Sequence, residues 1–158
     1  MKKTFLFFVI FIAACETSQA PSSQPIEAAK YNLALGLDYL QQHQWVEAQQ
    51  KLFLSTTQNP RAAEGWEGLA YFFQKTARPA VARKYYQKAL ALAPHDAALL
   101  NNYGAFLCQQ GESLEGIKLL EQALKDIHYA YPEKIQENIK ICQALEKFQG
   151  VASQAQTR

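Results

Sequence analysis

The side chains that could carry chemistry in this chain are few, because it has only three cysteines and three histidines. They are Cys15, Cys108, Cys142, His43, His95 and His128. The sequence has no HxxxH or CxxC spacing that would indicate a metal site. It also has no glycine-rich phosphate loop and no GxSxG motif. We therefore expect no catalytic residue, metal or cofactor, and a protein that is not an enzyme.

Cys15 follows a segment that is typical of an exported protein. Lys2 and Lys3 give a positive start, and residues 4–12 (TFLFFVIFI) form a largely apolar run. A membrane-spanning helix needs roughly 20 apolar residues, so this run is too short to span and fits the apolar region of a signal peptide. We predict a signal peptide over residues 1–14.

The residues around the predicted cut point to a second chemistry. Residues 12–15 (IAAC) resemble the lipobox of bacterial lipoproteins, in which the cysteine thiol carries a diacylglycerol and becomes the first mature residue. Cys15 is therefore the predicted lipid-attachment site, and an ordinary signal peptide with an incidental cysteine is the alternative. By resemblance to enterobacterial sorting, Glu16 favours transport to the periplasmic face of the outer membrane. Covalent acyl lipid on Cys15 would be the only attached group.

Residues 15–28 are expected to form the lipidated N-terminus and a flexible tether. The stretch 16–25 (ETSQAPSSQP) is polar and rich in proline and serine, and ten extended residues reach roughly 30 Å. Loss of Lys2 and Lys3 lowers the count of basic residues from 16 to 14, which equals the 14 acidic residues. The sequence has no stripe of basic residues that would indicate a nucleic-acid partner. No small-molecule substrate is expected either.

Small residues recur through the remaining chain with a fixed period. Gly36, Ala70 and Gly104 are 34 residues apart, which is the period of the tetratricopeptide repeat (TPR), a pair of antiparallel helices. The predicted units are residues 29–62, 63–96 and 97–132. The middle unit fills every signature position, with Trp66, Leu69, Ala70, Phe73, Ala82, Tyr86, Ala89 and Pro94.

These positions have a physical meaning that predicts the fold. Small residues let the two helices of a unit approach closely, large apolar residues fill the space around that contact, and proline ends the second helix. Residues 133–149 resemble the first helix of a fourth unit, and 150–158 are expected to be a disordered tail. We predict an all-α, right-handed solenoid of three TPR units with a C-terminal capping helix.

Two cysteines remain once the lipid site is set aside, and an even count in an exported protein favours a disulfide. Cys108 is at position 12 of the third unit, in the first helix of that unit. Cys142 is at position 10 of the partial fourth unit, also in its first helix. Neighbouring first helices run side by side, and these positions differ by about 200° around a helix, so the two thiols could face each other. Two buried thiols acting as small apolar residues are the alternative.

First helices of TPR stacks line a concave face that binds peptides. The predicted groove has an apolar strip from the first unit and a mixed polar floor from the next two. Its residues are Leu33, Leu37, Leu40, Glu67, Tyr71, Gln74, Asn101 and Ala105. Three leucines on a face that should be solvated suggest a seat for an apolar segment. The alternative is that the polar tether, or residues around Ile26, fold back and cover them.

One stretch is more specific than the general TPR pattern. Residues 101–108 (NNYGAFLC), followed by 109–111 (QQG), closely resemble the hallmark of the PilF/PilW family of type IV pilus biogenesis lipoproteins. Residues 131–134 (YPEK) and 138–142 (NIKIC) resemble a later segment of that family, with Lys140 replacing a small residue. Relatives typically continue for about two more units, so this chain is shorter.

The resemblance implies an outer-membrane lipoprotein that acts as a pilotin. Such a protein binds subunits of the pilus secretin, brings them to the outer membrane and promotes their assembly into rings. It also implies a disulfide between Cys108 and Cys142. The rival interpretation is a TPR scaffold lipoprotein of another envelope machine, for outer-membrane protein insertion or for control of peptidoglycan synthases, because TPR folds serve all of these.

Overall fold

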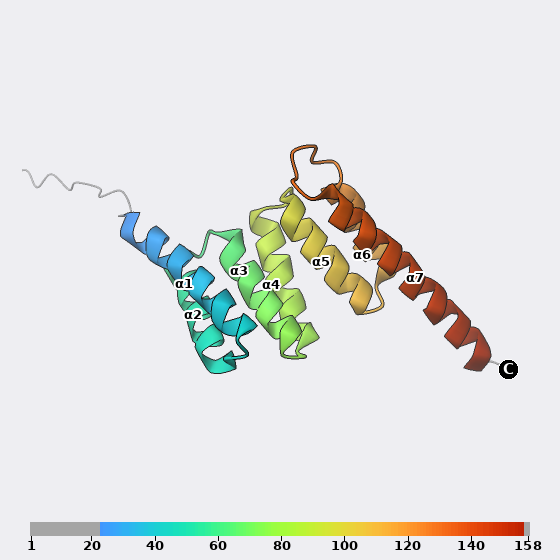
Figure 1. The fold of residues 1–158 in the computed structure, drawn as a ribbon, viewed down its shortest axis with the longest axis horizontal. Helices are drawn as coiled ribbons and strands as arrows, with labels where there is room; N and C mark the ends of the chain where they lie inside the picture. The colour runs from blue at the N-terminus through green and yellow to red at the C-terminus, as the bar shows by residue number, and fades with distance from the viewer. Residues whose placement is uncertain (1–22, 157–158) are drawn as a thin grey trace, which may run out of the picture.

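The computed structural model describes residues 23–156 as a row of α-helices. The signal peptide, the lipid site at Cys15 and most of the tether lie outside these residues. The helices are α1 (Ser23–Gln41), α2 (Trp45–Gln58), α3 (Ala63–Lys75), α4 (Pro79–Leu92), α5 (Ala97–Gln109), α6 (Ser113–Ala123) and α7 (Pro132–Gln156). Figure 1 shows them stacked in chain order as antiparallel pairs followed by α7. The fold is all-α and TPR-like, as predicted.

The turn inside each helix pair has the same unusual backbone. His43, Ala77 and Gly111 lie 34 residues apart and have positive φ angles of 60°, 55° and 86°. The residue after each donates its backbone N–H to the carbonyl five residues earlier, at 2.8–2.9 Å. This is the Schellman pattern that ends a helix with a left-handed residue. Only Gly111 adopts that conformation without a steric cost, since it has no Cβ.

The close approach within pairs depends on the small residues that the repeat predicted. A Cβ atom on Gly36 would lie 2.8 Å from Cγ of Leu52 in α2. One on Gly104 would lie 2.9 Å from the backbone oxygen of Gly116 in α6. Backbone cannot move aside as a side chain can, so the α5–α6 pair requires a glycine at position 104.

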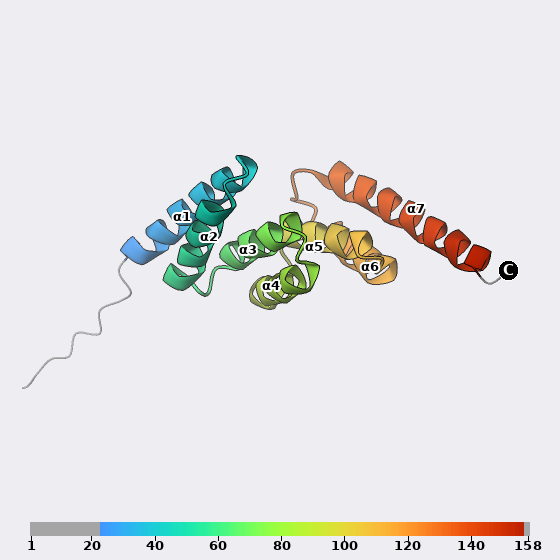
Figure 2. The ribbon, with the colours of Figure 1, turned by 90° about the horizontal axis from the view of Figure 1, so that it is seen from below.

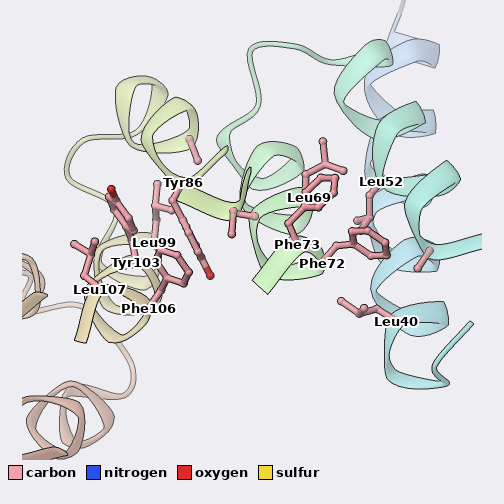
Figure 3. Close-up of a cluster of buried hydrophobic side chains, with 14 residues drawn as sticks. Leu40, Leu52, Leu69, Phe72, Phe73, Tyr86, Leu99, Tyr103, Phe106 and Leu107 are labelled. Carbon is pink, nitrogen blue, oxygen red and sulfur yellow. The ribbon is translucent and has the colours of Figure 1, made fainter. Parts of the chain in front are cut away.

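The core runs between the helix layers in two clusters. The first joins α1 to α5 and includes Leu52, Leu69, Phe73, Tyr86 and Phe106, several of them drawn in Figure 3. The second joins α5, α6 and α7 through residues such as Leu100, Leu120 and Ile135. Because α5 contributes to both clusters, it connects the two halves of the stack.

The two ends of the described chain differ from the sequence prediction. The tether was expected to reach residue 28, but α1 already begins at Ser23. Pro25 lies in the first turn of α1, where a missing N–H removes no helical hydrogen bond. The capping helix was expected to end at residue 149, with a disordered tail from residue 150, but α7 continues to Gln156. Gly150 costs a helix only about 1 kcal/mol relative to alanine and does not end it.

Helix α7 closes the stack through the apolar stripe that the sequence indicated. Ile135 and Cys142 are buried against α5 and α6, and Ile139 and Leu145 are partly buried beside them. Nδ2 of Asn138 donates to Oδ1 of Asn101 at 2.9 Å. The C-terminal part of α7 extends beyond α5 and α6 (Figures 1 and 2).

Candidate binding groove

The first helices of the pairs form one face of the molecule. Figure 2 shows α1 and α7 rising on either side of α3 and α5, with α4 on the opposite side. A groove of about 520 Å³ lies on this face across α1, α3 and α5. It is lined by Leu33, Leu37, Gln41, Glu64, Glu67, Gly68, Tyr71, Gln74, Tyr86, Asn102 and Ala105. Its volume is within the range of small-ligand sites, and it is open enough for a chain segment.

One end of the groove is apolar because a glycine in α3 allows α1 to come close. A Cβ atom on Gly68 would lie 2.8 Å from Cδ1 of Leu33 and 4.0 Å from Cδ2 of Leu37. Both leucines are only partly buried. They therefore present methyl groups to the groove while their stems pack on the core.

The floor of the groove is polar and links α3 to α5. Oε1 of Glu67 accepts a hydrogen bond from Nδ2 of Asn102 at 2.8 Å. About two turns further along α3, Nε2 of Gln74 donates a hydrogen bond to Oε1 of Gln109 in α5 at 3.1 Å. The Tyr86 hydroxyl, reaching in from α4, donates to Oε1 of Gln74 at 2.8 Å. These bonds hold the polar side chains in defined positions.

The groove has a negative electrostatic character. Burial raises the pKa of Glu67; the hydrogen bond from Asn102 opposes that rise, while the charges of Asp96 and Glu64 add to it. Burial also raises the pKa of the Tyr86 hydroxyl, and the nearby Glu67 charge contributes. None of the lining residues is Lys, Arg or His. The groove therefore favours neutral or cationic ligand groups over anionic ones.

The structure brings together six of the eight groove residues expected from the sequence, namely Leu33, Leu37, Glu67, Tyr71, Gln74 and Ala105. The other two are placed elsewhere. Leu40 is 4% exposed in the core between α1, α2 and α3, and Asn101 is 6% exposed and bonded to Asn138 of α7.

Both misplaced residues lie one position from a residue that does line the groove. In α1 it is Gln41, and in α5 it is Asn102. Helix α7 covers the flank of α5 that carries Asn101. Asn102, one position further on, therefore faces the groove in its place. Spacing within one helix could have indicated Gln41 and Gly68, each four residues after a groove residue. Tyr86 could not be found that way, because it belongs to the second helix of its pair.

The other cysteines and the histidines that the structure describes lie outside the groove. The structure joins Cys108 in α5 to Cys142 in α7 by a disulfide, with the Cα atoms 5.2 Å apart. Over residues 23–156, no three His, Cys, Asp or Glu side chains cluster in a way that could hold a metal ion. In that same part of the chain, no helix is both long and apolar enough to cross a membrane.

A stack of paired helices with a groove on its first-helix face defines a TPR protein-interaction scaffold. The sequence model of the tetratricopeptide repeat family matches residues 85–118. The type IV pilus assembly protein PilF of Pseudomonas aeruginosa is 34% identical over 113 residues, which are 72% of this chain and 45% of PilF.

Solved structures agree with the sequence comparison. A structure of P. aeruginosa PilF superposes with a TM-score of 0.75 at 32% identity, covering 78% of this chain and 56% of that one. PilW, a widely conserved type IV pilus biogenesis factor, gives a TM-score of 0.74 at 24% identity, covering 80% of this chain and 58% of PilW. The chain is a TPR protein related to the PilF/PilW type IV pilus assembly proteins. It spans about half the length of these relatives.

Proposed function

We propose that this protein is an assembly factor of type IV pilus biogenesis that acts as a pilotin for the pilus secretin. The observation that carries the proposal is the relation to PilF, a type IV pilus assembly protein, across most of the chain. The role is non-catalytic: the protein binds secretin subunits, brings them to the outer membrane and promotes their multimerisation.

The address would come from the N-terminus. Cys15 carries the lipid, and the residues between it and Ser23 let the folded part stand off the periplasmic face of the outer membrane. A single acyl chain binds membranes weakly, whereas two or three chains make the attachment effectively permanent. A Cys15→Ala protein that stays firmly in the membrane fraction would show that another feature anchors it.

The binding site would be the groove across α1, α3 and α5. The partly buried Leu33 and Leu37 offer an apolar seat, and the polar floor offers donors and acceptors held by their own hydrogen bonds. A secretin segment seated there is shielded from wrong contacts until it joins the ring. No covalent step is needed, because binding energy alone shifts subunits toward assembly.

The experiment compares groove variants with a matched surface variant in the native host. Leu37→Glu places a charge at the apolar end of the groove, and Tyr71→Ala removes a partly exposed ring from its lining. Leu54→Glu is the control, because Leu54 is exposed on α2 and outside this groove. Circular dichroism confirms that each variant folds.

The readout is the amount of heat- and detergent-resistant secretin multimer in the outer-membrane fraction. Both groove variants are expected to reduce it to near the level of a deletion strain, while the control retains it. Unchanged multimers in the deletion strain would refute the pilotin role and direct attention to another envelope assembly machine. Loss of multimers in the control as well as the groove variants would refute the assignment of the groove.

A further inference from the structure

The groove has two ends of different chemistry within one pocket. Leu33 and Leu37 of α1 supply the apolar end. Glu67 lies in the adjoining floor, directly before Gly68, on which Leu33 rests. A segment that fills the groove therefore meets methyl groups and a carboxylate side by side.

The Glu67 carboxylate has no cationic partner within the described residues. The ion pairs in residues 23–156 are Lys30 with Glu27 and Arg83 with Glu112. The side-chain hydrogen bond that Glu67 accepts comes from the neutral amide of Asn102. A partly buried carboxylate without a counter-charge is costly, and its attraction for a cation is stronger than on an open surface.

The neighbourhood strengthens this negative field. Asp96 and Glu64 both act on Glu67 in the direction that disfavours its charged form. The Lys75 ammonium is held 5.3 Å from the centre of the Tyr71 ring and is not among the lining residues. A cation brought in by a ligand would relieve the repulsion among these carboxylates.

A purely structural role would not require the charge. A glutamine at position 67 could accept the same hydrogen bond from Asn102 without the cost of burying a carboxylate. Charged groups retained at such a cost are found preferentially at functional sites. Burial, together with the charges of Asp96 and Glu64, raises the pKa of Glu67, so the fold pays for a charge that its own packing does not use.

We propose that the groove selects protein segments in which an apolar side chain stands beside a lysine or arginine. Leu33 and Leu37 receive the apolar side chain, and the Glu67 carboxylate pairs with the cation. This selectivity rests on the proposed function in that it takes the groove as the site where a partner segment binds. Glu67 is then a specificity-determining residue, and acidic segments are rejected by repulsion.

The test uses a phage-displayed library of random twelve-residue peptides, selected in parallel on the purified wild-type protein, on Glu67→Gln and on Glu121→Gln. Glu121 is the matched control, because it is exposed on α6 and does not line the groove. We expect wild type and control to enrich peptides with an apolar residue next to Lys or Arg. Glu67→Gln is expected to enrich apolar peptides without the basic residue.

One enriched peptide and its Lys→Gln or Arg→Gln version are then measured by fluorescence anisotropy with wild type and Glu67→Gln. A charge-assisted pair predicts a loss of about tenfold for either change alone and little further loss for both together. The wild-type affinity should also fall as salt is raised. Enrichment of no peptide, or of peptides without a basic residue by the wild type, would overturn the proposal.

This test separates the selectivity from the pilotin role. Secretin binding is scored independently, by co-purification of secretin with wild type and Glu67→Gln. Basic selectivity without secretin binding would refute the pilotin role and leave the groove chemistry standing. Secretin binding by both proteins together with absent basic selectivity would refute the selectivity alone.

Discussion

Reduction of the disulfide between Cys108 and Cys142 should release α7 from the stack. The two cysteines are 34 residues apart, and closing a loop of that length removes about 12.6 cal/mol/K of entropy from the unfolded chain. At 25 °C this corresponds to about 3.8 kcal/mol of stability. With a urea slope of about 2 kcal/mol/M, the unfolding midpoint should fall by about 1.9 M on reduction.

The loss should be concentrated in one part of the molecule. Helix α7 packs against α5 and α6, and Ile135 and Cys142 are the fully buried residues among its side chains up to residue 148. The longer cluster from α1 to α5 does not include α7. Amides of α7 should therefore exchange hydrogen much faster in the reduced protein, while amides of α3 and α4 change little.

The assay compares oxidised and reduced wild type with a Cys108→Ala/Cys142→Ala variant in the same buffers. Urea unfolding is followed by circular dichroism and local opening by hydrogen exchange with mass spectrometry. Reductant should leave the double variant unchanged. If thiol titration confirms reduction and the midpoint moves by less than about 0.5 M, or α7 keeps its protection, the argument from loop entropy is wrong.

Substitutions at four positions test three other features, namely a buried carboxyl, the turns within helix pairs and a helix cap. Burial holds the pKa of Glu67 above its ordinary value, so the folded state binds that proton more tightly than the unfolded state, and this stabilisation is lost as pH rises through the raised pKa. Glu67→Gln should thus be more stable than wild type at pH 7 in thermal unfolding, with the difference shrinking as pH is lowered; a less stable variant at pH 7 contradicts this. Ala77→Gly should raise the free energy of unfolding by about 0.5 kcal/mol, because it relieves a left-handed alanine at φ 55°, whereas Gly111→Ala should lower it by about 1 kcal/mol. If urea unfolding shows that both substitutions stabilise the protein, or that both destabilise it, the argument from backbone conformation is refuted. Asp96→Ala should cost about 1 kcal/mol in the same assay, because it removes the cap that accepts from the Leu99 N–H at 2.8 Å, and Asp96→Asn should retain most of that stability.

The architecture was accessible from the sequence because its information is periodic. Small residues such as Gly36, Ala70 and Gly104 repeat at the contact between paired helices, and any shift of phase would place a larger side chain there. The stripe on α7 was also legible, since Ile135 and Cys142 lie on one helical face. Contacts of this kind follow from spacing within and between equal units.

The details that escaped prediction depend on neighbours that spacing does not describe. Asn101 faces α7 and not the groove, because α7 covers that flank of α5 and supplies Asn138 as its partner. His43 and Ala77 adopt left-handed backbone although their residue types give no such signal, since the Schellman turn between packed helices imposes it. The start of α1 and the end of α7 were missed because short polar segments have only a weak preference between helix and coil.

The covalent bond between α5 and α7 also determines how the chain carries mechanical load. It closes residues 108–142 into a ring that contains all of α6. Tension applied between the two ends of the protein takes the short route across the bond, where the Cα atoms are 5.2 Å apart. Helix α6 and the loop before α7 therefore bear no part of that tension. A pull on the molecule can extend it from either end, but it cannot draw out this segment while the bond is intact.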